Sequence, residues 1–340
     1  MGSVKDLIVL ASPLEDVAGK GKFLFSDRYS VFDWGEMPDH IPHKGESLCL
    51  IGAHFFEKLE KMGMKTHYLG LEEEGKIKRL SELKSPSSVM VVQLFRVIVP
   101  SQIQGYYDYG LYQDVRGNFL LPFEFIYRHA LPEESSFLRR LREGKITLAE
   151  YGLEEMPEAG KPLSSPILDV STKLEEQDRY LTWGEVLQFG IISSEEAAQI
   201  KDLLRNVGNF IAREVQRIGL TNEDGKIELA MDGNRNLVLV DVLGTPDECR
   251  FTYQGFEVSK EVARSFYRKT SWYEEVKKAK TERSTGWKGL VKSVPPPLPS
   301  SLLDLISFLY QRIAMDLTNR EWFPGVPSLE EIVDKMKRLI

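Results

Sequence analysis

The spacing of apolar residues predicts a β-rich beginning of the chain followed by a helix. Within residues 7–32, short apolar runs alternate with Gly, Asp and Ser, which is typical of antiparallel strands joined by tight turns. From Leu48 to Met62 the apolar residues fall at helical spacing, and Gly63 stands where that pattern stops. We therefore expect a small sheet with one helix packed on it.

The middle of the chain alternates between strand and helix patterns. Residues 89–99 and 119–127 are rich in β-branched and aromatic side chains, which favour strands, and a Tyr-rich loop at residues 105–112 separates them. A long amphipathic helix is predicted after the capping box formed by Ser193 and Glu196. The mixture indicates an α+β fold.

The last third of the chain is predicted to be helical around a rigid connection. A charged helical region spans residues 260–280, prolines cluster at residues 295–299, and an apolar helix follows at residues 302–317. The apolar face of this last helix is expected to pack on the body of the protein or on a second subunit of a homo-oligomer. We divide the chain into a nucleotide-binding lobe (1–120), a substrate- and metal-binding lobe (121–285) and a C-terminal extension (286–340).

Composition narrows the class of protein. The chain has 340 residues, of which 42% are hydrophobic and 28% charged, enough for a large core and two lobes. No apolar run approaches the roughly 20 residues that cross a bilayer. The net charge of −7 opposes non-specific nucleic-acid binding. Only two cysteines occur, too few for a disulfide framework or a thiolate zinc site, so we expect a cytoplasmic protein.

Two alternating segments around a polar turn predict a hairpin that holds a metal ion. If Asp232 pairs with Leu237, closing a four-residue loop, Glu228 stands opposite Asp241 on the same face. Facing carboxylates repel, so this register needs a cation, and such ligands suit Mg²⁺ with phosphate oxygens completing its shell. The alternative is a two-residue turn at Asp232 and Gly233, which separates the carboxylates.

The residues flanking the hairpin favour the phosphate site. Asp224 and Lys226 lie upstream on the face of Glu228, and Arg250 ends the polar turn that follows. Arginine suits bidentate contacts with phosphate or carboxylate. Taken alone, Arg250 would be interpreted as one half of a surface ion pair.

A second basic segment lies near the N-terminus. Lys20 and Lys22 are two residues apart, hence on one face of a strand, and Gly19 beside them allows close backbone approach to a ligand. This arrangement can hold a triphosphate. The alternative is an ordinary exposed turn, and the segment is not the Walker pattern.

Taken together, the order of these motifs resembles the SAICAR synthetase family between about Gly19 and Arg268. The motifs that carry the resemblance are Gly19-Lys20-Gly21-Lys22, Ser26-Asp27-Arg28-Tyr29-Ser30-Val31-Phe32-Asp33 (similar to an Asp-containing strand), Lys44-Gly45, Pro122-Phe123-Glu124-Phe125-Ile126-Tyr127-Arg128 with Ser135-Ser136, Ser171-Thr172-Lys173, Asp224-Gly225-Lys226-Ile227-Glu228, and Val240-Asp241 with Thr245-Pro246-Asp247 and Arg250.

The resemblance implies an ATP- and Mg²⁺-dependent ligase. Such an enzyme has a β-rich N-terminal lobe and a larger, ATP-grasp/kinase-like lobe, and joins L-aspartate to 5-amino-1-(5-phospho-D-ribosyl)imidazole-4-carboxylate (CAIR) through an acyl phosphate, giving SAICAR, ADP and phosphate. It implies catalytic roles for Lys226, Asp224 and Lys173, nucleotide binding by Gly19, Lys20, Lys22, Glu228 and Asp241, with the last two as metal ligands, and substrate binding by Asp33, Arg128, Ser136, Asp247, Arg250, Lys260 and Arg264.

Two positions depart from the family pattern. Val242 replaces an acidic residue after Asp241, and Ser135 replaces a glycine before Ser136. Strand alternation points residue 242 away from the face of Glu228 and Asp241. These departures, together with the Tyr-rich loop, leave open a diverged paralogue with another carboxylate substrate. A non-catalytic nucleotide-binding regulatory protein is a further alternative, against which the joint presence of Glu228, Asp241 and Lys226 argues.

Overall fold

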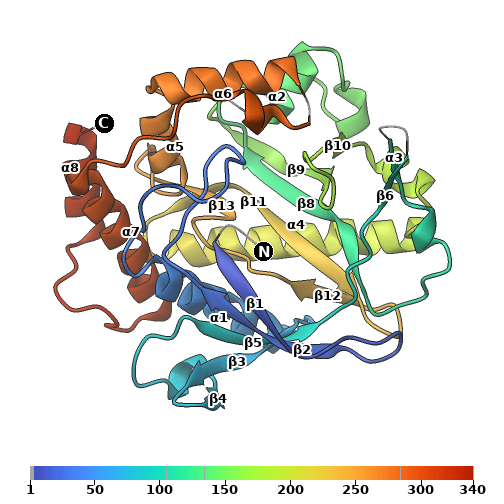
Figure 1. The fold of residues 1–340 in the computed structure, drawn as a ribbon, viewed down its shortest axis with the longest axis horizontal. Helices are drawn as coiled ribbons and strands as arrows, with labels where there is room; N and C mark the ends of the chain where they lie inside the picture. Colours follow the sequence, from blue (N-terminus) through green and yellow to red (C-terminus); the bar gives the residue numbers. More distant parts are fainter. Residues whose placement is uncertain (1–3, 104–105, 134, 284, 340) are drawn as a thin grey trace.

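The computed structural model describes residues 4–103, 106–133, 135–283 and 285–339. Its first sheet is antiparallel, with one helix, α1 (Lys44–Lys61), packed on it (Figure 1). Met90 and Tyr68 point from this sheet toward α1, whose Gly52 lies close to Met90. In spatial order the strands are β1 (Lys5–Ala11), β2 (Gly19–Phe25), β5 (Val89–Leu94), β3 (Tyr68–Glu73) and β4 (Lys76–Lys78).

The second sheet lies above the first in Figure 1, and the long helix α4 (Ser194–Gln216) crosses one of its faces. The Ser193 hydroxyl caps α4, as its capping box predicts. Gly208 lets the helix approach the sheet, because a Cβ there would lie 2.7 Å from the Tyr127 ring. In spatial order the strands are β10 (Tyr180–Leu181), β9 (Pro162–Thr172), β8 (Phe119–Ala130), β11 (Thr221–Met231), β13 (Cys249–Tyr253) and β14 (Phe256–Glu257), with β12 (Leu237–Val240) also paired to β11.

Backbone hydrogen bonds join the two sheets at Leu239, in a contact that we call the Leu239 junction. The N–H of His67 donates to the Leu239 carbonyl at 2.9 Å, and the N–H of Leu239 donates to the Lys65 carbonyl at 2.9 Å. Gln93 of β5 continues the ladder by donating its N–H to the His67 carbonyl. The first sheet is thereby held in a fixed position beside β12.

The remaining elements surround this framework. Helix α7 (Ser300–Thr318) packs on α1, and the residues of its predicted apolar face (Leu302, Ile306, Leu309 and Ile313) are all buried within the chain. That face is therefore used by the body of the protein itself. The other helices and the small hairpin are α2 (Ser136–Arg142), α3 (Trp183–Gln188), α5 (Glu261–Tyr267), α6 (Ser271–Glu282), α7 (Ser300–Thr318), α8 (Leu329–Leu339), β6 (Ser101–Ile103) and β7 (Tyr106–Asp108).

Two expectations about the strands are wrong. The N-terminal strand pattern ends at Phe25, and residues 26–33 run irregularly rather than as an Asp-containing strand. In the carboxylate hairpin Leu237 pairs with Met231 rather than Asp232, so Glu228 stands opposite Val240. The Asp232 carboxylate accepts backbone N–H bonds inside the turn, which draws this residue out of the strand and lengthens the loop to five residues.

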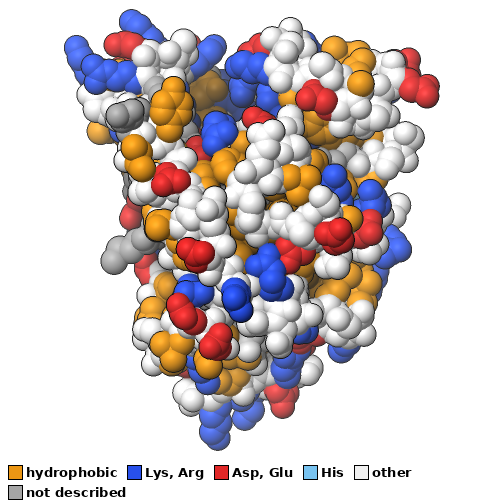
Figure 2. Space-filling model, turned by 90° about the vertical axis from the view of Figure 1, so that its right-hand side faces the viewer, with side chains coloured by type: hydrophobic (Ala, Val, Ile, Leu, Met, Phe, Trp, Pro, Cys, Tyr) orange, Lys and Arg blue, Asp and Glu red, His pale blue; other side chains and the backbone are white. Residues whose placement is uncertain are grey.

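Other expectations concern the surface and the division of the chain. Among the described residues no helix is long and apolar enough to cross a membrane. Figure 2 shows basic and acidic side chains interspersed over one face of the molecule, with a notch at its upper edge. Of the predicted Tyr-rich loop, Gly105 lies outside the described residues. The three-part division of the chain stays a prediction.

Candidate active site

A polar cavity of about 260 Å³ lies where β8, β11 and β13 meet the start of α5. Because alternate residues of a strand share a face, Asp224 and Lys226 both point into it from β11. Eight of the predicted site residues line this cavity: Asp33, Arg128, Asp224, Lys226, Asp247, Arg250, Lys260 and Arg264. Folding therefore brings together groups from five separate segments of the chain.

Two arginines, on the strands that flank β11 on either side, share one carboxylate in this cavity. Arg128 donates to Asp224 Oδ2 at 3.3 Å, and Arg250 donates to the same oxygen at 3.1 Å. Arg128 is buried and also donates to Asp169 at 3.1 Å and to the Ser136 hydroxyl at 3.3 Å. Ser136 thus lies behind Arg128 rather than on the lining of the cavity. Asp224 thus holds the two guanidinium groups next to each other. Two adjacent guanidinium groups can bind a phosphate dianion.

Lys226 is held as an ammonium group among acids. Its Nζ donates to Glu124 Oε1 at 2.7 Å and lies 3.3 Å from Glu248. Burial disfavours the charge, but Glu248 and Glu124 outweigh burial and hold the pKa of Lys226 well above its usual value. In the same cavity burial, followed by repulsion from Glu124, raises the pKa of Asp178 to about 6.

Glu228 and Asp241 converge beside this cavity in spite of the shifted register. Asp241 leaves β12 with a left-handed backbone (φ 63°). Burial and the charge of Asp241 raise the pKa of Glu228, whereas Lys5 and Lys173 hold the pKa of Asp241 low against its burial. Glu228 forms an ion pair with Lys173, and Asp241 forms one with Lys5 at 2.5 Å. Two carboxylates and two ammonium groups thus form one charged cluster.

Lys5, rather than Lys20 or Lys22, contacts the Glu228–Asp241 pair. It opens β1 opposite Phe25, and its Nζ lies 5.0 Å from the centre of the Phe23 ring on the same face of the sheet. By strand alternation Lys20 and Lys22 lie on the other face of β2. Lys22 pairs there with Glu72 at 2.5 Å, and Lys20 is exposed. The structure does not bring these two lysines to the carboxylates.

Gly19, the third member of that motif, lies where β2 begins very close to the end of β1. A Cβ at this position would lie 2.4 Å from the Ala11 carbonyl oxygen in the preceding strand. The glycine is therefore explained by the turn between β1 and β2.

The SAICAR synthetase family model matches residues 14–284 of the chain. The chain belongs to the SAICAR synthetase family. A putative phosphoribosylaminoimidazole-succinocarboxamide synthase of Archaeoglobus fulgidus is 48% identical over 340 residues, which is all of both chains. The corresponding synthase of Thermoplasma volcanium is 32% identical, over 88% of this chain and 93% of its own.

Solved structures of SAICAR synthetases share the fold. The Saccharomyces cerevisiae enzyme complexed with SAICAR superposes with a TM-score of 0.63 at 18% identity, covering 95% of this chain and 94% of its own. A type-2 SAICAR synthetase in complex with ADP gives a TM-score of 0.54 at 22% identity, covering 87% of this chain and 99% of its own. The chain is thus an ATP-dependent ligase of purine biosynthesis, which joins L-aspartate to CAIR.

This SAICAR synthetase holds Asp247 at the end of its cavity with residues far apart in sequence. Lys44 and Tyr310 each contact one oxygen of Asp247 at 2.6 Å. The helix that carries Tyr310 lies beyond residue 284, where the family match ends. Lys260 and Arg264, predicted to lie one above the other on a helix, are one turn apart at the start of α5.

Sequence reasoning missed Lys5, Glu124 and Tyr310. A single lysine before an apolar run and a tyrosine in an apolar helix give no chemical signal. Glu124 interrupts an apolar strand, and this buried acid was the one signal that pointed to a site.

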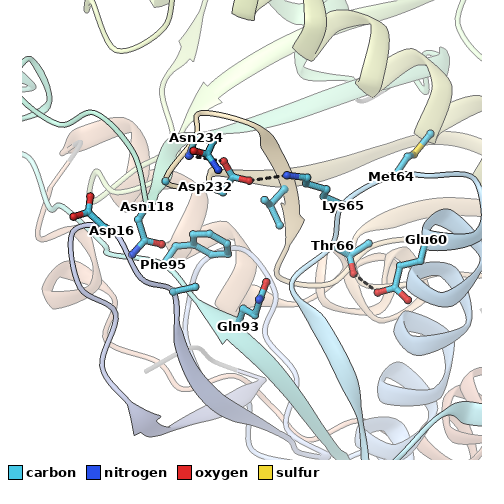
Figure 3. A pocket seen from close by; sticks show the side chains of 13 residues that line it. Asp16, Glu60, Met64, Lys65, Thr66, Gln93, Phe95, Asn118, Asp232 and Asn234 are labelled. Carbon is cyan, nitrogen blue, oxygen red and sulfur yellow. Dashed lines mark hydrogen bonds and ion pairs between the residues drawn. The ribbon is translucent and has the colours of Figure 1, made fainter.

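A second and larger cavity, of about 690 Å³, lies where the β1–β2 loop, the β11–β12 turn and the end of β5 meet. Figure 3 shows Asp232 pointing to Lys65 across one side, at 2.8 Å, with Gln93 and Phe95 on other walls. None of the residues predicted to act in the ligase site lines this cavity.

Proposed function

We propose that the cavity between β8, β11 and α5 is where this ligase binds CAIR and forms the amide. The observation that carries the proposal is that Arg128 and Arg250 share Asp224 in a cavity that Lys226 also lines, next to the Glu228–Asp241 pair. In this assignment the two arginines bind the phosphate of the ribotide. Lys260 and Arg264, which line the same cavity, are proposed to bind the substrate as well.

The nucleotide phosphates are proposed to lie between the Glu228–Asp241 pair and the two lysines beside it. Lys5 and Lys173 already neutralise these carboxylates, so both ammonium groups are placed to contact phosphate oxygens. This replaces Lys20 and Lys22 as the proposed phosphate ligands. The free end of Lys20 is exposed to solvent on the other face of β2.

The same pair of carboxylates fits Mg²⁺. No group of three or more His, Cys, Asp and Glu side chains able to hold a metal occurs in the part of the chain that the structure describes. Mg²⁺ is commonly held by only one or two carboxylates together with phosphates, which is the number present here. Burial and the charge of Asp241 raise the pKa of Glu228, so the charged form of this side chain would be stabilised most by a nearby cation. A bound Mg²⁺ would neutralise charge on the transferring phosphoryl group.

The proposed chemistry requires positioning rather than a protein nucleophile. The terminal phosphoryl group of ATP passes to the CAIR carboxylate, and ADP leaves. The amine of aspartate then attacks the acyl carbon, and phosphate leaves as the amide forms. Lys226 orients the carboxylate, Asp224 fixes the arginines, and Lys173 holds the phosphoryl group. Asp33, paired with Lys280 at 2.6 Å, lies at the rim.

One assay tests the assignment. The protein is incubated with ATP, Mg²⁺, CAIR and aspartate, and both ADP and the amide product are followed. We expect ADP and product in equal amounts, with no turnover when aspartate is omitted. ADP formation with another acid in place of CAIR would point to a paralogue, and no ADP with any acid would point to a binding protein.

We also propose that the enzyme acts in the cytoplasm. Cys49 and Cys249 are both free and buried, which suits a reducing compartment. Fractionation of the native cells, with the activity recovered in the cytoplasmic fraction, tests this point.

A further inference from the structure

The Tyr-rich loop between β5 and β8 contacts the loop that carries Lys173. We call residues 106–112 the Tyr segment and residues 173–179 the Lys173 loop. The Tyr109 hydroxyl donates to Glu175 Oε1 at 2.8 Å, and the backbone N–H of Glu176 donates to the Tyr107 hydroxyl at 2.8 Å. Two consecutive residues of the loop are thus held by two tyrosines.

Tyr109 is itself firmly anchored. It is only 4% exposed, and its ring lies 4.4 Å from that of Phe189 and 6.2 Å from that of Tyr112, measured between centres. Phe189 in turn packs on Phe123 of β8, at 5.9 Å. Burial, followed by the neighbouring Glu175, raises the pKa of Tyr109 far above its usual value, so the hydroxyl keeps its proton. It is a fixed donor attached to the core.

Glu175 is the residue through which Tyr109 holds the Lys173 loop. Its side chain is 5% exposed and accepts a second bond from Arg179 at 2.9 Å. Arg179 closes the base of the loop, because its N–H donates to the Thr172 hydroxyl and its carbonyl accepts from the Thr172 N–H, both at 2.9 Å. Glu176 also accepts from the N–H of Gly286 at 2.9 Å.

The loop held in this way reaches the ligase site at two points. At its start, Lys173 forms the ion pair with Glu228 and lies 4.0 Å from Glu124. Near its end, Asp178 lines the cavity. A displacement of the loop would move both groups relative to the carboxylates of β8 and β11.

We propose that Tyr109 and Tyr107 are positioning residues for the ligase reaction, which hold Lys173 and Asp178 in their working places through Glu175 and Glu176. The inference rests on the proposed role of Lys173 at the phosphates. The tyrosines touch neither substrate nor nucleotide in this arrangement. They act through the loop.

The test is Tyr109→Phe, which keeps the ring and removes only the hydroxyl. Loss of a hydrogen bond to a charged group corresponds to a factor of about ten, and we expect kcat/KM to fall by about that factor. The melting temperature should change by no more than a few degrees. Tyr106→Phe is the matched control, because Tyr106 is 80% exposed, and it should leave kcat/KM unchanged.

A cycle with Lys173→Ala separates positioning from a general loss of structure. If Tyr109 acts through Lys173, adding Tyr109→Phe to the Lys173→Ala enzyme should lower its residual turnover by less than twofold. An equal tenfold loss in both backgrounds, or full activity of Tyr109→Phe beside an impaired Lys173→Ala enzyme, would overturn the inference. Full activity of Lys173→Ala would instead overturn the proposed role of Lys173 itself.

Glu175→Gln gives a second, independent reading. The amide keeps an acceptor for the Tyr109 hydroxyl but weakens the bond to Arg179. We expect a smaller loss of kcat/KM than for Glu175→Ala. Equal losses for the two variants would contradict the proposed role of the hydrogen bond from Tyr109 to Glu175.

Discussion

Lys5, in the first strand of the chain, lies 2.5 Å from Asp241, which follows the last strand of the carboxylate hairpin. The contact joins the two sheets at the place where the nucleotide phosphates are proposed to bind. In the proposed arrangement Lys5 takes the role that was expected for Lys20 and Lys22. The ion pair makes several features of the site testable.

Replacing Lys5 by Met should weaken nucleotide use. The variant keeps the apolar stem over Phe23 and loses the ammonium group, so we expect kcat/KM for ATP to fall by tenfold or more, by the ~1.5–3 kcal/mol typical of a charged hydrogen bond. Steady-state kinetics with varied ATP measure this loss. Lys20→Met is the control and should behave like the parent enzyme. An equal loss in both variants would restore Lys20 as a phosphate ligand.

Glu228→Gln should abolish turnover without unfolding the protein. The amide preserves the shape of the side chain and removes the negative charge of one of the two proposed metal ligands, so we expect turnover to fall more than ~100-fold. The variant loses the ion pair with Lys173 but also relieves the repulsion between two buried carboxylates, so the melting temperature should stay within a few degrees of that of the parent. Product formation and thermal melts check the two points. Near-full activity would contradict the metal assignment.

Tyr310→Phe should show that α7 contributes to the active site. The variant removes one of the two partners of Asp247, so we expect a destabilisation of about 1–2 kcal/mol and a raised KM for CAIR. Asp247→Asn should cost more stability, about 3–5 kcal/mol, because it leaves the buried Lys44 ammonium without its counter-ion. Denaturant unfolding measures the two destabilisations, and steady-state kinetics with varied CAIR measure the KM. The reverse order would show that Lys44 has another partner.

Glu257→Gln should stabilise the protein at alkaline pH. Burial, together with Glu223 and Glu261, raises the pKa of Glu257 to about 8 from the ordinary 4.5. Below pH ~4.5 this group is protonated in both folded and unfolded chains, so parent and variant should melt alike. As pH rises from 4.5 through 8, the parent loses stability that the variant keeps. Melting curves from pH 4 to 9 test this, and a constant difference would contradict it.

Local sequence patterns predicted the regular elements well. The capping box of Ser193 and Glu196 marked the start of α4, and helical spacing marked α1. Such signals are local, since each depends on residues within a few turns. The order of motifs was also enough to predict the family and eight of the residues that line the cavity.

The failures concern register and long-range contacts. Whether Leu237 pairs with Asp232 or Met231 depends on hydrogen bonds that the Asp232 carboxylate makes inside its own turn. The choice between Lys20 and Lys5 depends on which face of the sheet turns toward β12. Neither can be worked out from spacing along one segment.

The Leu239 junction and the Lys5–Asp241 pair fasten the first sheet in unlike ways. Peptide hydrogen bonds at Leu239 do not titrate and carry no net charge, so salt and pH leave that side fixed. The pair at Lys5 is electrostatic, and any phosphate that attracts Lys5 or cation that attracts Asp241 competes with it. One attachment of the first sheet is therefore insensitive to salt and pH, and the other is an ion pair that bound phosphate or a bound cation would weaken.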